Sequence, residues 1–203
     1  QLISKYRRNY DSLQYNEIIR QFESYSQKID TLEEVDEIMG FEGIGAKLFW
    51  NCYRQLLNKS VFERREYRPA PDYINSALNL GYAFLVNEIT ASLYCEKFDL
   101  EIGFLHSIFY GRNSLALDIM EEFRTPFIDA WILKLFNLNI LSEKHFKTES
   151  EGYQLDDIGF SKFMESYHEH MEEGQWREKF RSQAWKLREA LIKNEDYQPY
   201  LWE

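Results

Sequence analysis

Apolar and polar side chains follow the period of an α-helix along nearly the whole chain. In residues 2–26, apolar or aromatic side chains recur every three to four positions, at Leu2, Tyr6, Tyr10, Leu13, Ile18 and Phe22. The stretch "DTLEEVDEIMG" (30–40) predicts a short helix with Thr31 as N-cap, Glu34 as its capping-box partner and Gly40 as its end. A long buried helix is expected to follow at once, in "EGIGAKLFWNCYRQLL".

The middle and the end of the chain predict further helices. In "RPAPDYINSALNLGYAFLVNEITASLYCEKF" the prolines indicate a turn, after which Asp72 can cap a helix. That helix is apolar on most of its faces, so we expect it at the domain centre. Residues 114–123 predict an amphipathic helix, and "TPFIDAWILKLFNLNIL" predicts another that starts at Thr125 and Pro126. Two last helices are expected at residues 157–173 and 175–193.

One stretch departs from the helical pattern. Residues 145–156 alternate in a way that allows two short strands, with Gly152 as the turn between them. The sequence therefore predicts an all-α fold: a single multi-helix domain over residues 1–203, with at most a short β-hairpin near residues 145–156.

Composition indicates a folded protein in a reducing compartment. The chain of 203 residues is 44% hydrophobic and 17% aromatic, which favours a packed core over disorder. Its two cysteines, Cys52 and Cys95, are too few for a disulfide-built scaffold. No apolar run reaches the ~20 residues that a bilayer span needs. We therefore expect a soluble, cytoplasmic protein without a membrane partner.

Charge is unevenly distributed. The formal net charge of −10 argues against a nucleic-acid partner when it is taken as an average. Residues 174–193, however, hold six Lys or Arg against two Glu, whereas residues 151–173 hold one Lys against seven Asp or Glu. This segregation permits a basic strip on an acidic body, and it is also the pattern of an ordinary solvated helix face.

Three acidic side chains gather on the helix expected at residues 114–123. At about 100° per residue, Asp118, Glu121 and Glu122 lie opposite the apolar face. They form either a solvated face or a set of carboxylates that meet around a cation, which would remove their mutual repulsion.

Glu42 and His106 each allow two interpretations. Glu42 stands beside Gly43 and Gly45 in the expected first turn of a helix, where the helix dipole favours an acid. The glycines permit either close packing or the approach of a DNA backbone. His106, inside "GFLHSIFY", is either a core histidine bonded to a backbone carbonyl or a ligand. The remaining histidines stand on segments with an exposed pattern and receive no role: His145, His168 and His170.

Several blocks, in order along the chain, resemble one family, the CRISPR adaptation integrases of the Cas-one family of metal-dependent DNA endonucleases. "MGFEGIGAKLFW" resembles the family's glycine-flanked glutamate motif, and "FERREYRPAPDYINSALNLGYAFL" resembles its arginine- and proline-rich stretch. "DLEIGFLHSIFYGRNSLALDIMEEFRTPFIDAWILKL" is the most specific block, and "GYQLDDIGFSKFMESYHEHM" and "YQPY" are also similar.

The resemblance implies a set of site residues and a reaction. Glu42, His106 and Glu121 match the family's metal ligands, and Asp118 matches a frequently acidic neighbour with a supporting catalytic role. Two carboxylates and an imidazole suit Mg²⁺ or Mn²⁺. In the family, the 3′-OH of an incoming spacer DNA attacks a phosphodiester, and the same site acting with water is a nuclease. The assignment between Asp118 and Glu121 as third ligand is open, because the family often has Asp where this chain has Glu121.

The resemblance also implies partners: spacer and repeat DNA ends, a second copy of the full-length protein, and a Cas-two family protein. Four arginines could grip phosphates or pair with nearby acids such as Glu63 and Glu66: Arg64, Arg65, Arg68 and Arg112. The family's β-rich N-terminal domain is not expected in this chain, whose first residue matches the linker helix after it. Two alternatives to the integrase stay open: a noncatalytic helical scaffold that binds DNA or a protein, and a metal phosphohydrolase for small substrates.

Overall fold

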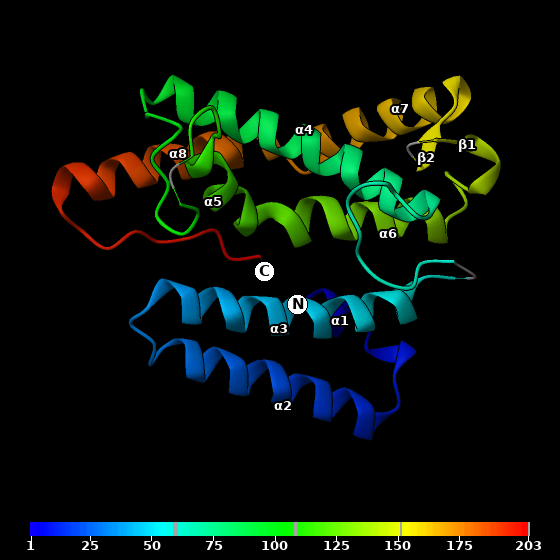
Figure 1. Ribbon diagram of the computed structural model, residues 1–203, viewed down its shortest axis with the longest axis horizontal. Coiled ribbons are helices and arrows are strands. Elements are labelled where there is room, and N and C mark those ends of the chain that lie inside the picture. The colour runs from blue at the N-terminus through cyan, green and yellow to red at the C-terminus, as the bar shows by residue number, and fades with distance from the viewer. Residues whose placement is uncertain (59–60, 108, 151, 203) are drawn as a thin grey trace. The chain divides into compact units, whose positions relative to one another are not determined.

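The computed structural model describes residues 1–58, 61–107, 109–150 and 152–202, which are mostly helical (Figure 1). The all-α fold class is thereby confirmed. The chain divides into two compact units, Gln1–Arg65 and Glu66–Glu203, and each is described by itself. Within the described ranges, none of the helices combines the length and the apolar character needed to cross a bilayer.

The first unit is built on two helices that run side by side, α2 and α3 (Figure 1). Its elements in chain order are α1 (Leu2–Lys5), the 3₁₀-helix η1 (Arg7–Asn9), α2 (Ser12–Ile29) and α3 (Val35–Leu56). The pattern of residues 2–26 is thus divided, because Tyr10 is extended and Asp11 starts a new helix. The Asp11 carboxylate accepts a hydrogen bond from the Gln14 N–H at 2.8 Å and caps α2.

Helix α3 corrects the prediction of a short helix that ends at Gly40. The helix begins at Val35 and continues through Gly40, Gly43 and Gly45. Thr31 is not its N-cap: the Thr31 hydroxyl donates to the Lys28 carbonyl at the end of α2. A glycine costs a helix interior only about 1 kcal/mol relative to alanine, and the buried side chains Trp50, Cys52, Tyr53 and Leu56 further along α3 compensate for that cost.

The second unit contains the remaining helices and the only strands in the described residues. Its elements are α4 (Tyr73–Cys95), α5 (Ser114–Phe123), the π-helix η2 (Arg124–Asp129), α6 (Ala130–Asn137), the 3₁₀-helix η3 (Glu143–His145), β1 (Phe146–Glu149), β2 (Gly152–Leu155), α7 (Asp157–Glu173) and α8 (Trp176–Lys193). The ends of α7 and α8 lie within one residue of the predicted ranges.

Helix α4 is the centre of this unit, as its apolar faces predicted. It contacts α5, η2, α6, α8 and β2. The Asp72 carboxylate caps it, accepting hydrogen bonds from the N–H groups of Ile74 and Asn75 at 2.9 and 2.8 Å. At Gly81, a Cβ would lie 3.0 Å from Ile128, so the absence of a side chain lets α4 and η2 approach closely.

Helices α5 and α6 are joined through η2, which corrects the prediction of a new helix starting at Thr125 and Pro126. The helical run continues through Pro126. Proline lacks an N–H and its ring clashes with the carbonyl four residues earlier. A wider π-turn accommodates this clash, and such turns occur often at functional sites.

The β-hairpin expected near residues 145–156 is confirmed. Strands β1 and β2 pair in antiparallel fashion, with Phe146 opposite Leu155. Gly152 is the first residue of β2, with φ of +96°, and is not itself the turn; its neighbour Glu151 lies outside the described residues. The exposed pattern expected for His145 and His170 is wrong: His145, the last residue of η3, is buried where η3 contacts α7, and the His170 ring on α7 stacks on Phe127 and Trp131.

Candidate functional site

The site is built around a contact between His106 and Asp118. His106 lies in the connection between α4 and α5, and Asp118 lies on α5 with a fully buried side chain. Asp118 Oδ1 is 2.6 Å from His106 Nδ1 and also accepts the His106 backbone N–H at 2.9 Å. A carboxylate accepts from Nδ1–H, and in the neutral ring this tautomer leaves the lone pair on Nε2.

The other oxygen of Asp118 organises the backbone of the same connection. Oδ2 accepts the N–H groups of Phe104 and Leu105 at 2.6 and 3.1 Å. At Gly103, an added Cβ would lie 2.6 Å from this oxygen, so only glycine fits there. Asp118 therefore fixes a tight turn that presents the His106 ring, whose side chain is 28% exposed.

This contact corrects the solvated-face interpretation for Asp118 and the core-histidine interpretation for His106. Asp118 does not belong to a solvated face, because the connection from Gly103 to His106 folds over it. His106 is not a core histidine bonded to a carbonyl, since its ring partner is a carboxylate. Helical periodicity places Asp118 away from the core, but it carries no information about a loop that covers that side of the helix.

Glu121 lies less than one turn further along α5 and is held by an arginine. Arg124 Nη1 contacts both carboxylate oxygens of Glu121, at 2.9 and 2.8 Å. The guanidinium lies 4.9 Å from the centre of the Tyr82 ring, and the Tyr82 hydroxyl donates to the buried Asp129. Burial alone would lower the pKa of Arg124, but Tyr82, Glu121 and Asp129 outweigh it and raise the pKa.

Glu122, next along the helix, has a structural role. Its carboxylate accepts hydrogen bonds from the Tyr197 hydroxyl at 2.7 Å and the Tyr200 N–H at 2.6 Å. Burial raises the pKa of Glu122, and these two hydrogen bonds oppose the shift. The three acids of α5 therefore have three different partners, which are a histidine, an arginine and the C-terminal segment.

Glu42 lies on α3, in the first unit, and is exposed. It stands at the eighth position of α3 and not in the first turn as predicted, because the helix starts at Val35. A Cβ at Gly43 or Gly45 would meet no described atom of its own unit within 4 Å, so close packing inside this unit does not explain these glycines.

The structure brings together two of the predicted site residues, His106 and Asp118. Among the described residues, no three His, Cys, Asp or Glu side chains are grouped so as to hold a metal ion. Glu42 and the other predicted ligands belong to different units, and each unit is described by itself. The metal set of Glu42, His106 and Glu121 therefore stays a prediction.

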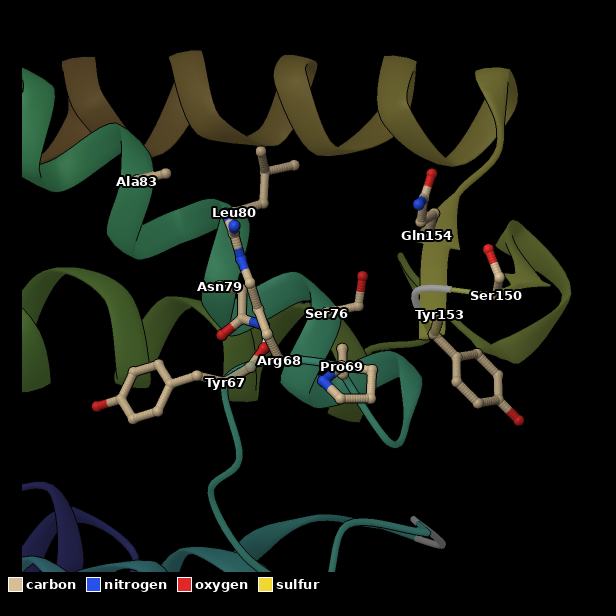
Figure 2. Close-up of a pocket in the computed structure, with 11 residues that line it drawn as sticks. Tyr67, Arg68, Pro69, Ser76, Asn79, Leu80, Ala83, Ser150, Tyr153 and Gln154 are labelled. Carbon is tan, nitrogen blue, oxygen red and sulfur yellow. Dashed lines mark hydrogen bonds between the residues drawn. The ribbon is translucent and has the colours of Figure 1, made fainter.

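The four candidate DNA-binding arginines have different surroundings. Arg64 and Arg65 end the first unit, and Arg68 lines a pocket of the second unit beside α4 (Figure 2). Arg112 is engaged within the protein, since its guanidinium donates to the Ser107 carbonyl and, at 3.3 Å, to the Ser114 hydroxyl. Sequence reasoning did not identify Arg124, although its spacing of three residues from Glu121 on a helix was a usable signal.

Comparison with known proteins identifies relatives of this chain. The family model described as CRISPR associated protein Cas1 matches residues 1–169. The chain is 33% identical over 181 residues to the CRISPR-associated endonuclease Cas1 1 of Thermus thermophilus, covering 83% of this chain and 57% of that protein. For the CRISPR-associated endonuclease Cas1 of Thermotoga maritima the identity is 32% over 151 residues, covering 73% and 47%. The chain spans about half the length of these curated relatives.

Solved structures have the same fold. A Cas1 protein from Thermotoga maritima matches with a TM-score of 0.81 and 31% identity, over 90% of this chain and 59% of that chain. A chain of a partial Cas6-RT-Cas1–Cas2 complex matches with a TM-score of 0.88 over 98% of this chain and 63% of that chain, and its 18% identity shows the fold alone. From the family model and these relatives, we conclude that the chain belongs to the Cas1 family of CRISPR-associated proteins.

Proposed function

We propose that this chain is the catalytic part of a metal-dependent DNA endonuclease and integrase of CRISPR adaptation. The 3′-OH of a spacer end would attack a phosphodiester of the repeat. One P–O bond forms and another breaks, so the reaction needs no external energy source. The observation that carries the proposal is the contact of Asp118 with His106 Nδ1 at 2.6 Å, in a chain that belongs to the Cas1 family.

The donor types of Glu42, His106 and Glu121 support a divalent cation. A carboxylate on Nδ1 is the usual outer partner of a metal-bound imidazole, because it fixes the ring and makes Nε2 a stronger ligand. We propose that His106 Nε2, Glu42 and Glu121 hold Mg²⁺ or Mn²⁺, a donor set rich in oxygen with one nitrogen. The bound ion would stabilise charge on the phosphate under attack and favour the nucleophilic oxygen.

The other residues of the site act on these ligands. Asp118 orients His106 and is not itself a ligand, because its oxygens are occupied by the His106 ring and three backbone N–H groups. Arg124 limits the directions in which Glu121 can point. The glycines at positions 43 and 45 place no side chain beside Glu42, which supports the approach of a DNA backbone.

We also propose the partners that the family implies. These are spacer and repeat DNA ends, a second copy of the full-length protein and a Cas2 protein, in a cytoplasmic setting. The support is that a structurally similar chain comes from a partial Cas6-RT-Cas1–Cas2 complex. Since the chain spans about half of its relatives, these partners belong to the proposal for the whole protein.

The test is cleavage of branched and single-stranded DNA with Mn²⁺, comparing wild type with Glu42→Ala and His106→Ala. His168→Ala is the matched control, since His168 is an exposed histidine on α7. We expect both site variants to lose activity with unchanged thermal unfolding, and the control to keep it. Equal activity in all four proteins would indicate a contaminant and would favour the noncatalytic scaffold.

A further inference from the structure

The π-helix η2 begins and ends with two residues of opposite charge, Arg124 and Asp129. In an α-helix, side chains five positions apart point about 140° away from each other. In a π-helix the hydrogen bonds join residues five positions apart, as the Ala130 N–H does with the Thr125 carbonyl, so such side chains lie on the same side. The wide turn that accommodates Pro126 therefore places Arg124 and Asp129 on one side of the helical run.

Tyr82 of α4 connects the two charged groups. Its ring centre lies 4.9 Å from the guanidinium carbon of Arg124, and its hydroxyl donates a hydrogen bond to Asp129 Oδ1. Asp129 Oδ2 accepts from the Thr125 hydroxyl at 3.1 Å, and the residue is only 2% exposed. The Asp129 carboxylate is therefore a fixed and buried group, held by the same tyrosine that carries the guanidinium.

Arg124 also holds Glu121, one of the proposed metal ligands. Its Nη1 contacts both Glu121 oxygens, at 2.9 and 2.8 Å. A divalent cation on Glu121 needs at least one of these oxygens and repels the guanidinium at short range. Metal binding at Glu121 must therefore displace Arg124. Both Glu121 and Asp129 raise the pKa of Arg124, so the guanidinium lies within electrostatic reach of the second acid as well.

We propose that Arg124 is a resident counter-cation that moves from Glu121 to Asp129 when a divalent metal ion binds. This inference rests on the proposed function, because it concerns the Glu121 arm of the metal set. The guanidinium stays beside the Tyr82 ring in both positions, so the change needs only a new side-chain rotamer and no movement of the helix. Asp129 and Tyr82 are positioning residues, because they hold the displaced guanidinium and do not touch the metal.

Competition between the guanidinium and the metal fixes the sign of each mutational effect. The metal binds only the fraction of molecules in which Glu121 is released, so the apparent affinity is reduced by that fraction. Removing Arg124 releases Glu121 in every molecule, and Mn²⁺ should bind about tenfold more tightly if the released fraction is about 10%. Removing the charge of Asp129 makes the release harder, so Mn²⁺ should bind about tenfold more weakly.

The experiment is a double-mutant cycle of Arg124→Gln and Asp129→Asn in the full chain, with Mn²⁺ affinity measured by calorimetric titration. Without the guanidinium the acid has no cation to receive, so Asp129→Asn should change the affinity of Arg124→Gln by less than about twofold. Asn has the shape of Asp, and its amide can accept from Tyr82 and donate to the Thr125 hydroxyl, so we expect this variant to fold. Glu122→Gln is the matched control for the loss of a negative charge.

Thermal unfolding of each variant separates altered binding from lost folding. Unchanged or weaker Mn²⁺ binding in folded Arg124→Gln would overturn the inference, and so would an equal effect of Asp129→Asn with and without Arg124. A merely supporting arginine would give weaker binding when it is removed, which is the opposite sign.

A crystal structure of Glu121→Ala in EDTA tests the relocation without any metal and without removing the arginine. The Arg124 guanidinium should lie on the Asp129 carboxylate, and a guanidinium that stays away from Asp129 would overturn the inference. Failure of the proposed metal set would appear differently, as wild-type Mn²⁺ affinity in Glu121→Gln.

Discussion

One oxygen of Asp118 holds both the ring and the backbone of His106. Oδ1 lies 2.6 Å from Nδ1 and 2.9 Å from the backbone nitrogen of the same residue, while Oδ2 receives two further N–H groups. The position of the histidine therefore depends on a buried group on another element, and a mutation of Asp118 should affect folding and ligand binding together.

Replacing Asp118 with Asn should reduce both stability and metal affinity. The amide nitrogen cannot accept hydrogen bonds, so it would face backbone N–H donors that have no other partner. We expect the free energy of unfolding to decrease by about 2–4 kcal/mol and Mn²⁺ affinity to decrease about 10–100-fold. Denaturant unfolding and calorimetric titration measure the two effects, with exposed Asp157→Asn as control. Unchanged Mn²⁺ affinity would show that Asp118 only supports the fold.

Gly103→Ala should disturb the same turn from the other side. The added Cβ would lie 2.6 Å from Asp118 Oδ2 and 2.9 Å from the Ser114 Cβ, and the latter belongs to a buried helix start that cannot easily move. A decrease in the free energy of unfolding of about 1–3 kcal/mol is expected. Gly43→Ala has open space and a helical backbone, so it should stabilise α3 by about 0.5–1 kcal/mol. Equal effects of the two changes would contradict this argument.

The helices of the second unit could be predicted from periodicity because they bury one continuous face. Residues 114–123 were predicted as a helix and form α5, and Asp72 caps α4 as expected. The predicted helix boundaries were wrong where tertiary packing overrides the local tendency of glycine or proline to end a helix. Gly40 does not end α3, and Pro126 widens a helical run without ending it.

The site was only partly predictable for a related reason. Resemblance selected His106 and Asp118, but spacing gives no indication that residues 103–106 fold over Asp118. Likewise, the partners of Glu122 come from Tyr197 and Tyr200, more than seventy positions away. Contacts between distant segments depend on the tertiary fold, and one sequence read by itself carries little information about them.

Arg124→Gln should destabilise the protein, because the half-buried guanidinium offsets the negative charge of two acids. Its loss leaves Glu121 and the buried Asp129, whose negative charges raise the pKa of Arg124, without the positive charge that offsets them. We expect the free energy of unfolding to decrease by about 2–4 kcal/mol. Arg124→Lys should recover part of it, since lysine restores the charge but not the planar contact with Tyr82. Denaturant unfolding measures both variants, and equal losses would mean that shape, not charge, matters at this position.

Acid should destabilise the protein through His170. This ring stacks on Phe127 and on Trp131, with centroids 5.1 and 5.6 Å away, and Nε2 donates to the Phe127 carbonyl. Burial lowers the pKa of His170 to about 4; Lys134 and Lys179 also lower it, whereas the carbonyl and Glu173 raise it. The folded state therefore prefers the neutral ring, and its stabilisation is complete above pH ~6.5 and lost as the pH falls toward 4.

The change should reach at most ~3 kcal/mol, given 1.36 kcal/mol per pKa unit. Denaturant unfolding between pH 4 and 7 measures it, and His170→Phe should flatten that profile while keeping an aromatic ring in the stack. Exposed His168→Gln is the control and should leave the profile unchanged. Parallel profiles for wild type and His170→Phe would assign the acid sensitivity to other groups. Glu122 cannot imitate the effect, because a raised carboxyl pKa stabilises the folded state toward low pH and not toward high pH.

Adjacent glutamates on α5 give the sharpest test of the proposed metal set. Glu121 is 32% exposed and bound by Arg124, whereas Glu122 is committed to Tyr197 and Tyr200. Glu121→Gln should weaken Mn²⁺ binding in calorimetric titration, because a neutral amide is a poorer ligand than a carboxylate. Glu122→Gln removes the same charge one residue away and should leave the affinity nearly unchanged while lowering the unfolding temperature. Equal losses of affinity would reveal a general charge effect, and no loss in Glu121→Gln would exclude Glu121 as a ligand.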